Sequence, residues 1–268
     1  MRKTSSMEMA TAHDVYREGL MRLQASSVPF LVGGAFALES YTGLVRRTKD
    51  LDIFVRPDHA EPLLSMLAKA GYRTEIRFPH WLGKAFKDDH FIDIVFGSGN
   101  GVCAVDELWF RHAEPATILD LPVQIIPPEE MIWSKAFIME RERYDGADIA
   151  HMLRARGKTL DWRRMLARFN RHWRVLFSHL ILFGFIYPAC RPHIPQWVMD
   201  ELMRRLEQET ASLPGDESLC QGTLLSWSQY LMHMQRGDYV DARHRPRGTL
   251  TLQETAYITE TMKREEEK

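Results

Sequence analysis

Two aspartates that alternate with apolar residues in one short segment constrain this chain more than any other feature. The segment runs from Asp50 to Val55 and reads Asp-Leu-Asp-Ile-Phe-Val. Side chains two residues apart in a strand point to the same face, so Asp50 and Asp52 project together while the apolar residues pack inward. Paired carboxylates offer the hard oxygen ligands that Mg²⁺ prefers. The segment therefore predicts a strand with one solvated face that holds one or two metal ions.

A pair of glycines precedes this strand. The apolar run 29–32 ends at Gly33 and Gly34, and the helix-forming residues of 35–41 follow. Glycine lets backbone N–H groups approach a phosphate, and the N-terminus of a helix favours an anion. Cationic and hydroxyl side chains that could meet triphosphate oxygens stand just before the aspartates: Arg46, Arg47, Thr48 and Lys49. Taken singly, each feature also fits an ordinary turn or an exposed sheet face.

Taken in order, these features are far more specific. The chain has a strand, a Gly-Gly pair, a helix and then R-x-T-x-D-L-D over residues 46–52. In this order, the features resemble the nucleotidyltransferase superfamily that shares a fold with DNA polymerase beta. Within it, the chain is similar to the bacterial branch that includes abortive-infection type IV toxins. The resemblance covers about residues 28–155. It implies transfer of an NMP from an NTP, with ATP as one candidate, to an acceptor, with Mg²⁺ or Mn²⁺ as cofactor and release of pyrophosphate.

The resemblance also implies a third carboxylate on a following strand. Asp93 is a lone charge in the apolar run 91–96. A buried charge without a partner is costly, so a metal or a cation beside it is favoured over a purely structural role. We expect Asp93 to be a ligand of the catalytic metal and the base for the attacking hydroxyl, alongside Asp50 and Asp52.

The toxin branch further implies a lysine on a helix followed by an acidic motif. Lys135 fits the lysine, and Asp145 and Asp148 fit a D-x-x-D spacing that puts both on one helical face. Tyr144 stands where the branch has arginine. Lys135 is expected to hold a phosphate of the nucleotide, and the alternative is a solvated helix face with ion pairs.

The distribution of apolar runs predicts an α+β (mixed α/β) chain with a mixed sheet followed by an all-α region. Residues 1–127 are interpreted as the catalytic domain, with helices over 11–24, 35–41 and 58–69 and strands near 29–32, 51–55, 73–78, 84–87, 91–96, 118–119 and 123–126. Residues 128–235 are interpreted as nearly continuous helix, broken at Pro188, Pro192, Pro195 and 212–217. Residues 236–268 lose periodicity and are expected to be a partly mobile tail.

Composition excludes several other classes. With 35 basic and 36 acidic residues, the chain is neither histone-like nor strongly acidic. Three cysteines without a C-x-x-C pair argue against disulfides and a cysteine zinc site. No secretory signal is visible, and the most apolar run, 175–187, is too short to span a bilayer. We expect a soluble, cytoplasmic protein with no membrane partner.

The acceptor stays open at the level of sequence. The stretch 154–174 has eight basic residues and one acidic residue, interleaved with Trp162, Phe169 and Trp173. Such a stretch is typical of RNA or tRNA binding, although a solvated helix face with its aromatic residues in the core explains it as well. A small-molecule acceptor suits the same catalytic domain. A non-catalytic binding, antitoxin or regulatory module is the alternative function.

Overall fold

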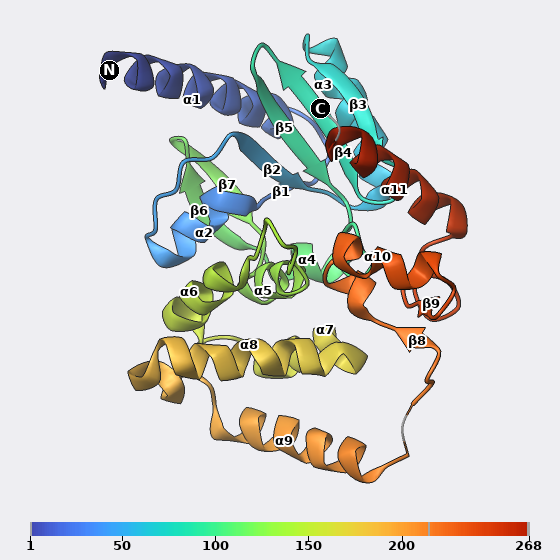
Figure 1. Ribbon diagram of the computed structural model, residues 1–268. Coiled ribbons are helices and arrows are strands. Elements are labelled where there is room, and N and C mark those ends of the chain that lie inside the picture. Colours follow the sequence, from blue (N-terminus) through green and yellow to red (C-terminus); the bar gives the residue numbers. More distant parts are fainter. Residues whose placement is uncertain (1, 214, 267–268) are drawn as a thin grey trace. The chain divides into compact units, whose positions relative to one another are not determined.

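The computed structural model describes residues 2–213 and 215–266 and divides the chain into two compact units. The first unit comprises the chain up to Pro127 together with the segment from Leu252 onward. The second unit runs from Pro128 to Thr251. Figure 1 colours the chain along the sequence, so that the blue-to-green elements and the red C-terminal helix mark the first unit.

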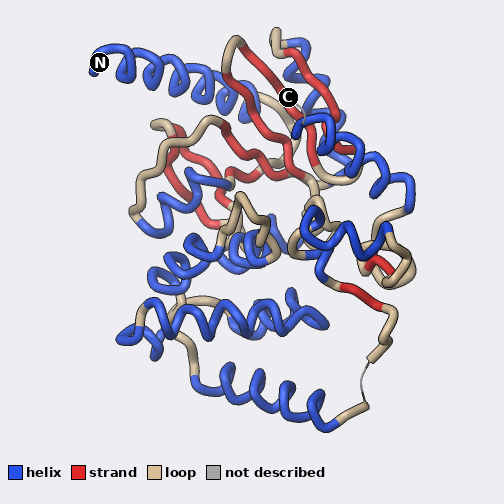
Figure 2. Tube along the Cα trace, in the orientation of Figure 1, coloured by secondary structure: helices blue, strands red, loops and turns tan. Residues whose placement is uncertain are grey.

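A seven-stranded mixed sheet forms the centre of the first unit (Figure 2). Its strand order is β3-β4-β5-β2-β1-β7-β6. The pairs β2·β5 and β1·β7 are parallel, and the other neighbouring pairs are antiparallel. The strand bounds are β1 (Leu31–Val32), β2 (Asp50–Phe54), β3 (Arg73–Phe78), β4 (Leu82–Lys87), β5 (His90–Val95), β6 (Glu114–Ile118) and β7 (Leu121–Ile125). The expected mixed sheet is therefore confirmed.

The helices of the first unit are α1 (Arg2–Gln24), α2 (Gly34–Thr42), α3 (Pro57–Lys69), α4 (Glu107–Arg111) and α11 (Leu252–Glu266). Local chemistry sets several of their ends. Proline occupies the first turn of α3, where its missing N–H is not needed, and Asp106 caps α4 by accepting from the Leu108 N–H. Helix α1 packs closely on β5, since a Cβ at Gly19 would lie 2.6 Å from Ile92 Cδ1.

The second unit is mainly helical. It contains α5 (Pro128–Ala136), α6 (Gly146–Arg156), α7 (Trp162–Phe169), α8 (Trp173–Ile186), α9 (Gln196–Ala211) and α10 (Trp227–Gln235). Three 3₁₀ turns, η1 (Asn170–His172), η2 (Pro188–His193) and η3 (Gly222–Leu224), and a short parallel pair, β8 (Leu219–Cys220) and β9 (Val240–Asp241), complete it. Helix α8 has 14 residues, and no helix among the described residues is long and apolar enough to cross a bilayer.

The expected nearly continuous helix after residue 128 is wrong at 218–226, where β8 and η3 lie, and at two places nearer its start. Between α5 and α6 the chain folds into a tight reversal, with a bridge between Met139 and Tyr144 and a hydrogen bond from the Asp145 N–H to the Ile138 carbonyl. Between α6 and α7, Asp161 starts a new helix by accepting from the Arg164 N–H. Neither break needs a proline, which is why apolar periodicity alone missed them.

The C-terminal segment contains a helix, α11, that the loss of periodicity after residue 236 did not predict, and its mobility stays a prediction. Helix α11 belongs to the first unit, where Ile258 is only 4% exposed and the Tyr257 ring meets the Phe78 ring edge-on at 6.3 Å. Residues 236–251, which include β9, belong to the second unit. Ile258 and Thr255 are the buried residues described on this helix.

Candidate metal and nucleotide site

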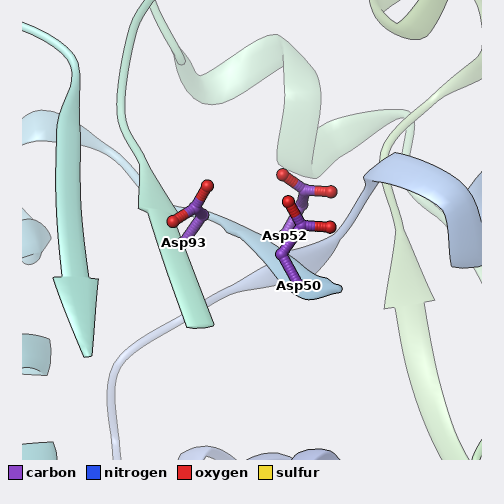
Figure 3. Close-up of side chains that lie close together, drawn as sticks. All are labelled: Asp50, Asp52 and Asp93. Atoms are coloured by element: carbon purple, nitrogen blue, oxygen red, sulfur yellow. The ribbon is translucent and has the colours of Figure 1, made fainter. Parts of the chain in front are cut away.

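Three aspartates come together on neighbouring strands of the first unit (Figure 3). Asp50 and Asp52 lie on β2, and Asp93 lies on β5 directly opposite Asp52 in the parallel register. One carboxylate oxygen from each residue lies within 4.8 Å of the others, and all three side chains are half-buried. The strand pair thus converts a sequence separation of some forty residues into one cluster of acceptor oxygens.

Two neighbouring side chains hold these carboxylates in place. The Thr48 hydroxyl donates to Asp50 Oδ1 at 2.5 Å and so orients the first aspartate, while its expected contact with a phosphate stays a prediction. Lys84 Nζ on β4 donates to Asp93 Oδ1 at 2.7 Å, and only 20% of the lysine side chain is exposed. The same ammonium lies 4.2 Å from the centre of the Phe91 ring.

The two glycines permit the close approach of α2 to β2. Gly34 has a φ of +56°, and a Cβ there would lie 1.7 Å from Asp52 Oδ2. A Cβ at Gly33 would lie 2.2 Å from the Phe54 ring, and the Gly33 N–H donates to the Asp52 carbonyl at 2.9 Å. The N-terminus of α2 therefore begins against the Asp52 carboxylate, and helix N-termini favour anions such as phosphate.

The remaining sequence candidates are distributed over both units. Arg46, Arg47 and Lys49 are exposed on the loop that joins α2 to β2. Lys135 lies in the second unit, where its ammonium contacts Asp145 at 2.9 Å and Asp148 at 2.8 Å. Both aspartates of the D-x-x-D spacing thus form ion pairs with one lysine. A nucleotide-binding role for Lys135 and for the loop residues stays a prediction.

Asp145 is a buried carboxylate that stays charged. Its burial would raise its pKa, but hydrogen bonds and charges from Arg143 and Lys135 outweigh the burial and lower the pKa below the ordinary value of 3.8. Lys135 is 15% exposed, so the ion pairs that it makes are largely removed from water. They fix α5 to the start of α6.

The sequence interpretation missed two residues near the triad. Lys84 is one of two lysines on β4, and it becomes informative only when the strand order puts it beside Asp93. Tyr16 lies on α1, and nothing in its local sequence sets it apart. Burial, followed by the charges of Asp50, Asp52 and Asp93, raises the pKa of its phenol to about 12.

The donor set fits a divalent hard cation. Three carboxylates within one small cluster carry more negative charge than one ammonium offsets, and Mg²⁺ and Mn²⁺ prefer such oxygen ligands. Asp50, Asp52 and Asp93 would hold the ion, and Thr48 and Lys84 would keep two of them oriented.

The basic stretch 154–174 is less available to a ligand than its charge suggests. Arg168 Nε donates to Glu130 Oε1 at 2.9 Å, and Arg164 pairs with both Glu129 and Glu130 at buried positions. Trp162 and Phe169 are buried, which agrees with the alternative of aromatic residues in the core. Exposed cations do remain, and they include Arg154, Lys158, Arg163, Arg171 and Arg174.

Solved structures similar to this chain include the antibiotic-resistance factor ANT(2'')-Ia, at 16% identity over 63% of this chain and 97% of that one, with a TM-score of 0.46. The lincosamide antibiotic adenylyltransferase LnuA is 16% identical over 52% of this chain and 94% of its own, with a TM-score of 0.36. JHP933 from Helicobacter pylori is 16% identical over 76% and 97%, with a TM-score of 0.40. No curated protein sequence matches significantly.

A family model decides the relationship. The model, described as an uncharacterised nucleotidyltransferase, matches residues 21–183, which is more than half of the chain. The matched range contains the two glycines, all three aspartates, Lys84 and Lys135. The chain therefore belongs to this nucleotidyltransferase family.

Proposed function

We propose that this protein is a Mg²⁺-dependent nucleotidyltransferase that transfers an NMP from an NTP to an acceptor. The observation that carries the proposal is the cluster of Asp50, Asp52 and Asp93 on two parallel strands within a nucleotidyltransferase family. A divalent ion bound there would neutralise phosphate charge and stabilise the leaving pyrophosphate.

Residues of the chain supply the proton acceptor and the contacts to the phosphates. The Asp93 carboxylate takes the proton of the acceptor hydroxyl, whose oxygen then forms a bond to the α-phosphorus. The bond from that phosphorus to the bridging oxygen breaks, and pyrophosphate leaves with its electron pair. The N-terminus of α2 at Gly33 and Gly34, with Arg46 and Lys49 on the loop that follows α2, positions the phosphates. Catalysis is then mostly positioning and electrostatic stabilisation.

Substitution of the triad tests the proposal directly. Asp50→Asn and Asp52→Asn should each abolish NMP transfer and Mn²⁺ binding while the thermal unfolding midpoint stays at or above that of the wild type, because carboxylate repulsion is relieved. Asp89→Asn, at an exposed turn position, is the matched control. Transfer at the wild-type rate by either triad variant would refute the catalytic role of the triad. No transfer and no Mn²⁺ binding by the wild type would instead favour a non-catalytic binding module.

The acceptor class needs a separate experiment. We propose two arms, total RNA including tRNA and a panel of small hydroxyl compounds, each incubated with one labelled NTP at a time and with ATP among the four. RNA as acceptor predicts that labelling falls steeply with salt and is weakened by substitution of exposed cations such as Arg163 and Arg171. A small-molecule acceptor predicts labelling that those substitutions leave unchanged.

A place in the toxin branch is supported by the R-x-T-x-D-L-D motif and by Lys135 with its two aspartates. It predicts that expression of the wild type arrests growth of a bacterial host, whereas Asp50→Asn does not. Normal growth with an active wild-type enzyme would remove the toxin assignment and leave the transferase activity standing.

A further inference from the structure

Tyr16 on α1 carries a buried hydroxyl whose hydrogen-bonding capacity is not used by the protein. The residue is 2% exposed, and among the described residues its hydroxyl makes no hydrogen bond. A buried polar group without a partner costs about 1–3 kcal/mol. Such a group calls for an explanation, and a role in catalysis or in contact with an ordered water or ion is one of the established explanations.

The position of the ring links this hydroxyl to the triad. Tyr16 meets the Phe36 ring edge-on at 6.3 Å and the His90 ring edge-on at 5.9 Å. Phe36 lies in the first turn of α2, which begins against Asp52, and His90 begins β5, which carries Asp93. The phenol therefore lies between the two elements that frame the carboxylate cluster.

Electrostatics agree with this position. After burial, the charges of Asp50, Asp52 and Asp93 all raise the pKa of the Tyr16 phenol, so the hydroxyl keeps its proton at neutral pH. Ionised carboxylates offer only acceptor atoms, so an oxygen ligand in their midst must receive its hydrogen bonds from other groups.

We propose that Tyr16 is a further ligand-binding residue of this site, whose hydroxyl donates a hydrogen bond to an oxygen of the bound metal–nucleotide complex. The acceptor is either a water on the metal or an oxygen of the triphosphate. The inference rests on the proposed function, and it makes the N-terminal helix α1 a part of the binding site as well as a support for the sheet.

The test compares Tyr16→Phe with Tyr72→Phe in the full chain. Tyr72 is an equally buried tyrosine that packs beside α1, but its hydroxyl donates to the Val15 carbonyl at 3.5 Å. Mn²⁺ affinity is measured by electron paramagnetic resonance, first without nucleotide and then with the α,β-methylene analogues of the four NTPs. Thermal unfolding is followed in the metal-free protein.

We expect Tyr16→Phe to weaken binding by about five- to tenfold in at least one arm, the loss of one hydrogen bond. A loss with Mn²⁺ alone identifies a metal-bound water as the acceptor, and a loss only with an analogue identifies a phosphate oxygen. The metal-free variant should unfold at the wild-type temperature or above it, because an unsatisfied hydroxyl has been removed. Tyr72→Phe should bind as the wild type does.

Two results would overturn the inference by itself. They are wild-type affinity of Tyr16→Phe in both arms, and a clear loss of stability in the metal-free variant, which would reveal a protein partner for the hydroxyl. If the wild type binds neither Mn²⁺ nor an analogue, the proposed function fails and this inference fails with it.

Discussion

At the scale of single residues, Gly34 and Gly43 share a left-handed backbone conformation but differ in what surrounds them. Both have a positive φ, at +56° and +71°, but a Cβ at Gly34 would collide with Asp52 whereas a Cβ at Gly43 would meet nothing within 4 Å. Gly43→Ala should therefore cost only the strain of a left-handed alanine, about 1–2 kcal/mol. Gly34→Ala should cost more than that and should displace the Asp52 carboxylate.

Urea unfolding and Mn²⁺ binding of the two variants measure this difference. We expect Gly43→Ala to bind Mn²⁺ as the wild type does and Gly34→Ala to lose most of its affinity. Equal effects of the two substitutions would mean that α2 does not depend on this close approach.

Lys84 is the second residue whose role depends on its neighbour. Its ammonium neutralises part of the triad through Asp93, whereas Lys87 on the same strand pairs with Glu18 at 2.6 Å. Lys84→Met should lower the unfolding temperature of the metal-free protein, because the carboxylate repulsion is no longer offset, and bound Mn²⁺ should restore more stability than in the wild type. Lys87→Met should leave the Mn²⁺-induced shift unchanged, and an equal shift in both variants would refute the assignment.

At the scale of elements, the reversal between α5 and α6 depends on charge. Asp145 has a lowered pKa, so the stability that it contributes is fully present above the ordinary value of 3.8 and is lost as the pH falls through the lowered pKa. Asp145→Asn should be less stable than the wild type at pH 7 by about 1–3 kcal/mol. Below pH 3.8 the two proteins should converge.

Acid titration of the free energy of unfolding tests this expectation. Asp238→Asn is a suitable control because this carboxylate is exposed in the second unit, and its curve should follow the wild type. A constant gap between Asp145→Asn and the wild type from pH 7 to pH 2 would show that charge at residue 145 does not stabilise the reversal.

At the scale of the whole molecule, the C-terminal helix α11 belongs to the first unit, together with the chain up to Pro127. Ile258 on α11 is buried there, whereas Leu252 at the start of the same helix is 71% exposed. Ile258→Ala should destabilise the first unit by about 2–4 kcal/mol. Leu252→Ala should change the free energy of unfolding by less than about 0.5 kcal/mol. Calorimetry of both variants checks the difference, and a mobile tail would predict no effect from either.

Much of the first unit could be predicted from sequence because its signals are local. Alternation of aspartates with apolar residues, a glycine pair after a short apolar run and proline at the start of α3 each act within a few residues. The breaks before α6 and α7 were not predicted because apolar periodicity continues across them, although aspartate, here Asp145 and Asp161, is a residue that favours the start of a helix. Helix α11 was not predicted because it has few buried side chains and therefore shows no clear apolar periodicity.

The sequence alone determined that Asp50 and Asp52 share a face, since the period of a strand is two, and that a glycine turn precedes them. Only the tertiary structure decided that Asp93 stands opposite Asp52, that Lys84 offsets its charge and that Tyr16 packs against Phe36 and His90. Strand order and register are set by long-range pairing and burial, which a local pattern does not encode. The residues expected to carry the chemistry can thus be found in short motifs, whereas their arrangement in space is set by the fold.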